Sequence, residues 1–222
     1  MDLGPRTLFY LFGNPNLPVT NTLFVSWVVV LMLVFFSNMV TKDLKLIPGR
    51  VQNAVELLIS SIEDQIEPMI PGEGRNLLPF IATIFIYVGV SNLIGLIPLV
   101  PNPTGDVNIT VALALIVFVV SHYHGVETSG AWGYIKGFAE PIPFLFPLNI
   151  VSELAKPISH SFRLFGNIVG GTVIITLLYM AAPWFIPIPV HLFFDLFIGL
   201  VQALIFGMIA ISYISIAREY DE

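Results

Sequence analysis

The amino-acid sequence predicts an all-α membrane protein, with about five membrane-crossing helices, the last two of them long, and one amphipathic helix on the membrane surface. Two observations support this fold class. Of the 222 residues, 56% are hydrophobic and only 11% are charged, and the mean hydropathy is +0.87, so the apolar surface exceeds what a water-soluble core can bury. The apolar residues also form uncharged runs long enough to cross a bilayer, which takes roughly 17 to 25 residues.

Composition also excludes several classes of function. The net charge of −6 comes without a basic patch, which argues against nucleic-acid binding. The chain has no cysteine, so disulfides, thiolate metal sites and cysteine nucleophiles are excluded. The first residues lack the basic segment of a signal peptide, and we expect the first apolar run to remain as a span. We expect residues 1–222 to form one integral membrane domain.

Residues 22–40 are the first predicted span. These 19 uncharged residues reach about 28 Å as a helix, close to the thickness of the hydrocarbon core. Pro48-Gly49 then breaks the chain, and residues 50–67 are predicted to form the amphipathic helix. Its apolar residues recur at helical spacing, and its other faces carry Glu56, Glu63, Asp64 and Glu67. Anionic lipid repels such a face, which favours docking against protein as well as headgroups; a solvated face without a partner is the alternative.

Residues 77–100 and 107–123 are the next two predicted spans. Ser91 and Asn92 lie inside the first of them and must find partners within the helix bundle, because hydrocarbon offers none. A loop is expected after the second, carrying His122, His124, Glu127 and Lys136. The His-x-His pair lacks a second ligand pair at a recognisable spacing, so we expect interfacial polar residues and no metal site.

The last two predicted spans, residues 150–181 and 190–217, are longer than a bilayer needs. As helices they measure about 48 and 42 Å, so each must tilt or kink, and Pro157 invites a bend in the first. Gly166 and Gly170, with Gly171 beside them, leave one helix face open to another helix; internal packing is the alternative use of these glycines.

Polar residues within these two spans mark the candidate site. His191, Asp195 and Gln202 share a face of the last helix. Arg163 precedes 31 positions without a charge, and Glu153 and Lys156 are the only charges in the ten positions before it. An arginine near the centre of a span costs about 2.5 to 3.5 kcal/mol on insertion scales, which favours a functional role. The structural alternative is an ion pair with a neighbouring helix that locks the bundle.

The distribution of basic residues predicts the orientation. With five crossings and the N-terminus outside, Arg6 alone lies on the outer side. The inner side then collects six basic residues: Lys42, Lys45, Arg50, Arg75, Lys136 and Arg218. The positive-inside rule therefore places the N-terminus outside and the C-terminus in the cytoplasm.

Four segments resemble a known family. They are Ser159-His-Ser-Phe-Arg-Leu-Phe-Gly-Asn167, Gln202-Ala-Leu-Ile-Phe206, the Lys156-Pro157 step and Ser91-Asn-Leu-Ile-Gly-Leu-Ile-Pro98. From about Leu23 to its end, the chain resembles subunit a of the F-type ATP synthase, the static half of its rotary ion motor. The arginine block with its downstream glutamine is the specific part of this resemblance.

The resemblance implies a role for each of these residues. Arg163 would face the carboxylates of a rotating ring of c subunits, and the last two helices would form a tilted hairpin along that ring. Asn167 and Gln202 would line the ion path beside the arginine, and Glu153 would lie on its cytoplasmic approach. The implied partners are the c ring, the b subunits of the peripheral stalk and the lipid bilayer. No cofactor and no catalytic site within this chain alone are implied.

Two positions depart from the family pattern. Many members carry a glutamate nine residues after the arginine and a histidine seven before the glutamine, where this chain has Thr172 and Asp195. Threonine cannot titrate, so a proton relay would rest on Asp195, with His191 one turn away. The coupling ion stays open between H⁺ and Na⁺, because its binding carboxylate belongs to the ring. A bacterial plasma membrane is the expected location, with an organellar inner or thylakoid membrane as the alternative.

Two other functions remain as alternatives. A self-contained channel or secondary transporter would use Arg163 to bind an anionic substrate, but no inverted repeat is detectable. An intramembrane hydrolase would use Ser159 or Ser161 with His160, yet adjacent helical residues point about 100° apart. The sequence therefore favours the stator of a rotary motor.

Overall fold

The computed structural model describes residues 6–11, 18–42, 44–97, 100–139, 142–181 and 187–218, and this part of the chain is almost entirely helical. Five of its helices are long and apolar enough to cross a membrane, which confirms the predicted all-α membrane fold. The described residues also contain one small antiparallel hairpin of β1 (Thr7–Tyr10) and β2 (Pro18–Thr20).

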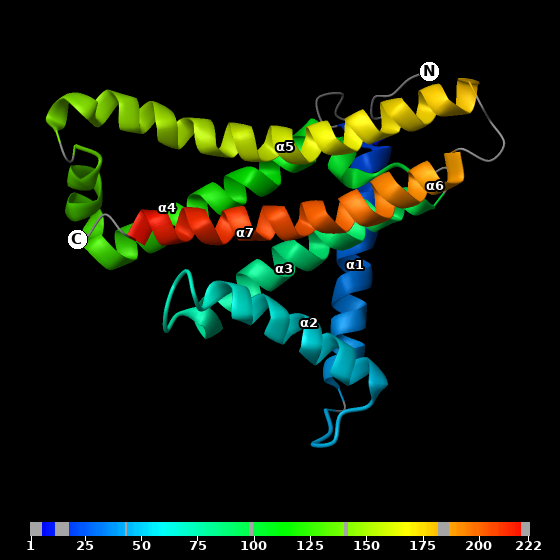
Figure 1. Ribbon diagram of the computed structural model, residues 1–222, viewed down its shortest axis with the longest axis horizontal. Coiled ribbons are helices and arrows are strands. Elements are labelled where there is room, and N and C mark those ends of the chain that lie inside the picture. The colour runs from blue at the N-terminus through cyan, green and yellow to red at the C-terminus, as the bar shows by residue number, and fades with distance from the viewer. Residues whose placement is uncertain are drawn as a thin grey trace.

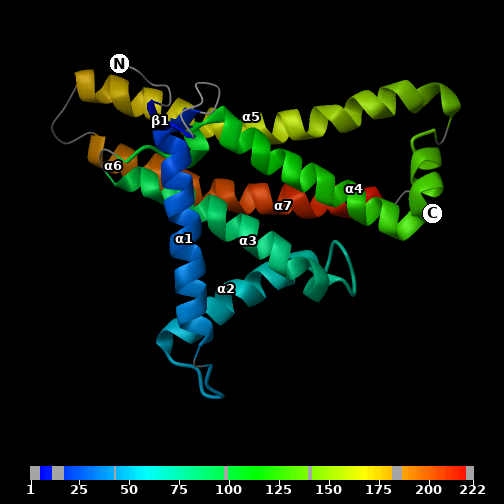
Figure 2. The same cartoon turned by 180° about the vertical axis from the view of Figure 1, so that it is seen from behind.

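Helix α1 (Asn21–Thr41) crosses the direction of the long helices and touches them chiefly through its first turns (Figures 1 and 2). The Thr20 side chain caps it by accepting a hydrogen bond from the backbone N–H of Leu23. Within the first two turns, the Thr22 hydroxyl donates to Asp106 Oδ2 (2.6 Å). The remaining length of α1 is largely exposed and apolar, as suits a surface in contact with lipid or another membrane protein.

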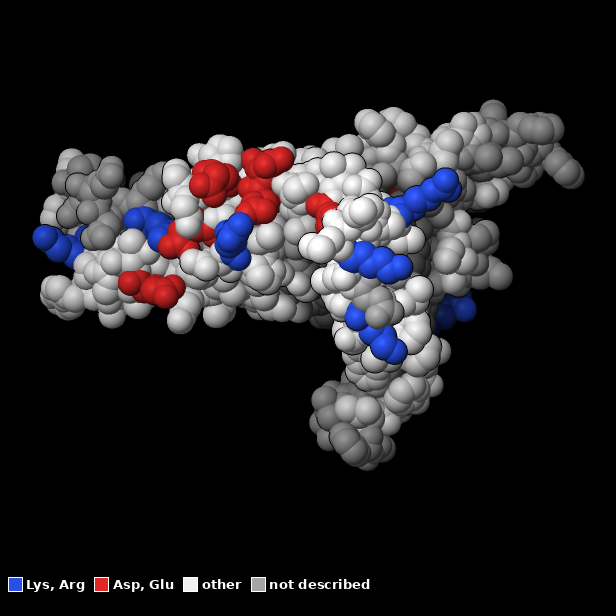
Figure 3. Space-filling model, turned by 90° about the horizontal axis from the view of Figure 1, so that it is seen from below, with Lys and Arg blue, Asp and Glu red and all other residues white. Residues whose placement is uncertain are grey.

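Helix α2 (Arg50–Ile66) is the amphipathic helix, at nearly the predicted bounds. Its C-terminal half docks on the bundle through Ile62 and Ile66, which are buried, whereas Val51 and Leu58 are exposed. Figure 3 shows acidic and basic side chains gathered on the face of the molecule seen from below. The predicted docking of this helix against protein is therefore found for the C-terminal half of α2.

The core lies between α3 (Gly74–Leu93) and α7 (Gly199–Arg218). Small residues bring these helices close: a Cβ added at Gly89 would lie 3.6 Å from the Ala203 Cβ, and one at Gly207 would lie 3.3 Å from the Phe85 ring. A short 3₁₀ turn (Ile94–Leu96) follows α3. The second predicted span therefore begins three residues earlier than expected and ends its α-helical part before Ile94.

Helix α4 (Val107–Gly137) corrects the prediction for the third span. We expected a loop after Tyr123, but His122, His124 and Glu127 all lie within the helix. Polar residues can continue a helix where it leaves the apolar layer, so the loss of hydropathy did not mark its end. The straight part ends at Gly130, whose φ of +71° turns the chain so that Tyr134 packs back near Gly125.

Helix α5 (Phe146–Ala181) is 36 residues long and continues through Pro157 as one helix. The last span is divided into α6 (Pro187–His191), a π-helical turn (Leu192–Ile198) and α7. In both views α5 and α7 run along each other, with α4 crossing between them at one end (Figures 1 and 2). This arrangement agrees with the predicted hairpin of two overlong helices.

Candidate functional site

Arg163 lies exposed on α5 beside exposed apolar side chains such as Phe162. Across the described ranges, no ion pair or hydrogen bond includes its guanidinium. The structural alternative, an ion pair that locks Arg163 to a neighbouring helix, is therefore not found among these residues. A permanent cation on an apolar outer face therefore needs an acceptor from beyond the described part of this chain.

The glycines that follow Arg163 divide into two groups. A Cβ added at Gly166 or Gly170 would meet nothing within 4 Å, so these two face open space. A Cβ at Gly171 would lie 3.1 Å from the Phe194 ring, so this glycine serves contact with the last span. Internal packing thus accounts for Gly171. Gly166 and Gly170 have no side chains, so another helix can approach the outer face of α5 closely next to Arg163.

Asn167 and Gln202 form a hydrogen bond between α5 and α7, in which Asn167 Nδ2 donates to Gln202 Oε1. Gln202 is only 2% exposed, whereas Asn167 is exposed on the same helix as Arg163. Four residues separate Arg163 from Asn167, about 6 Å along the helix axis. The predicted pair of amides is therefore brought together one turn from the arginine.

His191 and Asp195 form a second pair, with His191 Nδ1 2.6 Å from Asp195 Oδ2. The carboxylate lies close to the end of α3: a Cβ added at Gly95 would be 3.5 Å from Asp195 Oδ1 and 3.1 Å from Asn102 Nδ2. Thr172 donates its hydroxyl to the carbonyl of Ile168 (2.9 Å) and so makes its hydrogen bond within its own helix.

Asn92 secures the π-helical turn that carries Asp195. Its Nδ2 donates to the carbonyl of Gly199 (2.8 Å), and its Oδ1 accepts from the Thr104 hydroxyl (2.6 Å). Asn92 and Thr104 are both fully buried. The sequence predicted partners within the bundle for both Ser91 and Asn92, but it gave no signal for Gly199, which is 107 positions from Asn92. For Ser91 the prediction is wrong within the described residues, where its buried hydroxyl has no hydrogen-bond partner.

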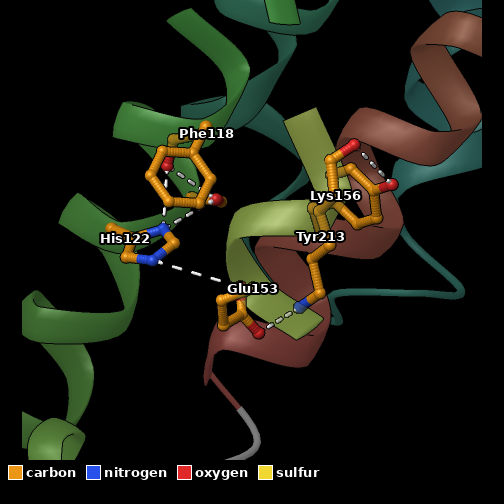
Figure 4. A network of polar contacts seen from close by, with 6 residues as sticks. Phe118, His122, Glu153, Lys156 and Tyr213 are labelled. Atoms are coloured by element: carbon orange, nitrogen blue, oxygen red, sulfur yellow. Dashed lines mark hydrogen bonds and ion pairs between the residues drawn. The ribbon is translucent and has the colours of Figure 1, made fainter. Parts of the chain in front are cut away.

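Glu153 lies at the other end of the candidate site and is only 7% exposed (Figure 4). The Lys156 ammonium pairs with Glu153 Oε1, and the His122 ring approaches Oε2 from α4, with Nε2 at 4.0 Å. The Lys156 ammonium also lies over the Tyr213 ring of α7, 5.5 Å from its centroid. Sequence reasoning missed His122 as a member of this group because α4 and α5 meet only in the fold.

The polar groups follow one another along the two long helices. Ten residues separate Glu153 from Arg163, about 15 Å along the axis of α5, and seven separate Asp195 from Gln202, about 10 Å along the last span. The amide pair joins the two helices between these ends. The Glu153–Lys156 pair therefore lies toward one end of the two helices from Arg163, and the His191–Asp195 pair lies toward the other.

The geometry does not support the other candidate sites. The His160 ring stacks on Phe206 (3.8 Å between centroids), and the Ser161 hydroxyl donates to the carbonyl of Ile158. Among the described residues His160 forms no hydrogen bond with Ser159 or Ser161, so the predicted alternative of a serine nucleophile activated by His160 is not supported. His124 pairs with Glu127 (3.1 Å), apart from the interaction of His122 with Glu153. Among the residues described, no cluster of three or more side chains could hold a metal ion.

Comparison with known proteins gives a consistent result. The sequence model of the family described as "ATP synthase A chain" matches residues 23–215. The chain is 35% identical to ATP synthase subunit a of Moorella thermoacetica, over 92% of this chain and 94% of the relative. It is 38% identical to ATP synthase subunit a 2 of Bradyrhizobium sp., over 98% and 97%. It is 34% identical to the sodium-ion-specific ATP synthase subunit a of Propionigenium modestum, over 95% and 84%. The chain therefore belongs to the ATP synthase A chain family, the integral membrane subunits that translocate protons or sodium ions in the Fo sector of the ATP synthase.

Proposed function

We propose that this chain is the stator of a rotary motor, in which Arg163 faces the carboxylates of a ring of c subunits and makes each one release its ion. The chain holds the two half-channels through which ions reach and leave the ring, and it assembles with peripheral-stalk b subunits. We place it in a bacterial plasma membrane with its N-terminus outside and its C-terminus in the cytoplasm, as the basic residues predict.

The chemistry follows from how a carboxylate responds to its surroundings. A carboxyl group in lipid is held neutral because desolvation disfavours its charged form, whereas a nearby cation favours ionisation. A ring carboxyl that turns from lipid to Arg163 therefore gives up its ion. Guanidinium stays protonated under all physiological conditions, so it cannot itself carry a proton from one half-channel to the other. The membrane potential supplies about 2.3 kcal/mol per charge per 100 mV.

The two half-channels lie on either side of Arg163. On the outer side, Asp195 and His191 form the titratable pair, with Asn167 and Gln202 between them and the arginine. On the inner side, Glu153 with Lys156 lies about 15 Å from Arg163 along α5. Thr172, nine residues after Arg163 on α5, lines the outer path without titrating. Because the two ends do not meet, an ion can cross only by riding on the ring.

One observation carries the proposal. Arg163 is an exposed cation on an apolar helix face, without an acceptor in the described part of its own chain, and beside two glycines that face open space. A helix of a partner can approach closely there and bring a carboxylate to the guanidinium. A ring of identical helices would present such a group in turn.

The test is to replace Arg163 in the assembled complex and to measure ATP-driven ion pumping into membrane vesicles. Arg163→Ala is expected to abolish pumping, and Arg163→Lys to retain only part of it, because burial can strip the proton from an ammonium group. Lys136→Ala, an exposed cation at the end of α4, serves as the matched control and should pump normally. Undiminished pumping by Arg163→Ala would remove the proposed role.

A further inference from the structure

We propose that His122 is a further residue of the ion path, where its imidazole Nε2 exchanges protons between water on the inner side and the carboxylate of Glu153. This inference rests on the proposed function and adds a proton-accepting residue that no sequence motif marked. It also commits the chain to protons as the ion that passes this group.

The hydrogen bonds of His122 determine which ring nitrogen is basic. Nδ1 lies 2.9 Å from the carbonyl oxygen of Phe118, and a carbonyl only accepts, so Nδ1 carries the hydrogen. The Ser121 hydroxyl is 3.4 Å from Nδ1, but it already donates its one hydrogen to the same carbonyl (2.8 Å). The neutral ring therefore keeps its lone pair on Nε2, the atom nearest Glu153 Oε2 (4.0 Å).

The position of His122 suits exchange with water. Its side chain is 28% exposed, whereas that of Glu153 is 10% exposed, so the imidazole is the more accessible member of the pair (Figure 4). Imidazole is the side chain that changes charge near neutral pH. The buried Glu153 carboxylate therefore receives its proton through the more exposed His122 imidazole.

The described groups that face His122 from the neighbouring elements carry little net charge. From α5, Glu153 and Lys156 face it and together carry no net charge. From the segment after Gly130, the Tyr134 ring lies 5.7 Å away, and from α7 the phenol of Tyr213 lies beneath Lys156; neither ring is charged. On its own helix, His124 is engaged by Glu127. Within the part of the chain that the structure describes, the Glu153 carboxylate is thus the charged group that lies within ion-pair distance of Nε2.

The exchange proceeds in two balanced steps. A hydronium ion gives its proton to Nε2, which leaves water and an imidazolium. The Nε2–H bond then breaks and the proton bonds to Glu153 Oε2, which restores neutral imidazole and forms the carboxylic acid. Because 4.0 Å is longer than a hydrogen bond, the transfer runs through a small rotation of either side chain or through one bridging water. During ATP synthesis the same steps run in reverse.

The experiment compares pH profiles of ATP-driven pumping in vesicles that carry the assembled complex. His122→Gln should pump nearly normally at about pH 6, where protons are abundant, and about fivefold more slowly than wild type at about pH 8.5, where a proton-collecting imidazole matters most. His124→Gln, two positions along the same helix, should follow the wild-type profile. The amount of assembled complex and its ATP hydrolysis verify that each variant folds.

A second variant separates the relay from a packing effect. Glu153→Gln should show the same loss at high pH, and the double variant should be no slower than the slower single variant, because both residues serve one transfer. A wild-type profile for His122→Gln, or a loss that is equal at every pH, would overturn the inference, as would pumping that requires Na⁺ and ignores these substitutions. Arg163→Ala measured alongside keeps the two claims apart: normal pumping there refutes the motor itself, whereas its loss together with an unchanged His122→Gln profile refutes only the relay.

Discussion

Asp195 is one of the two positions, with Thr172, at which the sequence departs from the pattern of many family members. The pattern has a histidine here and a glutamate nine residues after the arginine, whereas this chain has a carboxylate paired with His191 and the hydroxyl of Thr172. In the proposed function, the titratable groups of the outer half-channel are thus gathered on the last span. The Asn102 side chain, next to Asp195 across Gly95, adds a polar neighbour from the loop before α4.

This arrangement predicts the effect of a single substitution. Asp195→Asn keeps the size of the side chain and removes its ability to take up a proton, so passive ion flux through the membrane sector should fall about a hundredfold, the lower end of what a positioned acid or base contributes. The measurement is flux in vesicles after removal of the ATPase head. Glu127→Gln, a carboxylate paired only with a histidine on α4, is the control. An unchanged flux in Asp195→Asn would leave Asp195 a structural residue.

At the scale of elements, the start of α3 and the end of α7 are joined by an ion pair between Glu73 and Arg218 (3.2 Å). Glu73 also accepts a hydrogen bond from Asn76 Nδ2 (2.7 Å). These hydrogen bonds, first that from Asn76 and then that from Arg218, hold the pKa of Glu73 below its usual value. The pair closes the core at the end where both helices leave the membrane.

The lowered pKa fixes the sign of a pH effect. A carboxyl group whose pKa is lower when folded adds stability above its unfolded pKa, and this stability is lost as the pH falls through its folded pKa. Acidification from neutral pH to about pH 3.5 should therefore lower the melting temperature of wild type more than that of Glu73→Gln, by at most about 2 °C because the pair is partly exposed. Thermal unfolding of the complex in detergent measures this difference. Equal acid sensitivity of the two proteins would contradict it.

At the scale of the whole molecule, patterns within a few turns of chain predicted the fold. Uncharged runs located the five spans, helical spacing located α2, and the long runs after Pro147 indicated two helices longer than the membrane is thick. An isolated charge within an apolar run likewise marked Arg163 as the centre of the candidate site, and its role stays a proposal. Each of these signals depends on neighbouring residues alone.

What could not be predicted depends on contacts between distant segments. The extension of α4 beyond Tyr123 could not be predicted from hydropathy, because His124, Glu127 and Lys136 interrupt the apolar run within the helix. The π-helical turn at Leu192–Ile198 is held by Asn92 from another helix. His122 and Glu153 are 31 positions apart, and only the packing of α4 on α5 brings them together. The types of the residues alone do not predict which distant residues come into contact.

The central claim is that the open face of α5 beside Arg163 lies against the ring, and cysteine cross-linking tests it most directly. Because the chain has no cysteine, Gly166→Cys introduces a single thiol. This position faces open space and lies about one helical turn from Arg163. The account predicts a disulfide on mild oxidation with a cysteine placed one turn from the ring carboxylate, which requires Cα atoms within about 7 Å. Phe35→Cys, exposed on α1, should form no such bond. A ring that cross-links at Phe35→Cys and never at Gly166→Cys would contradict the account.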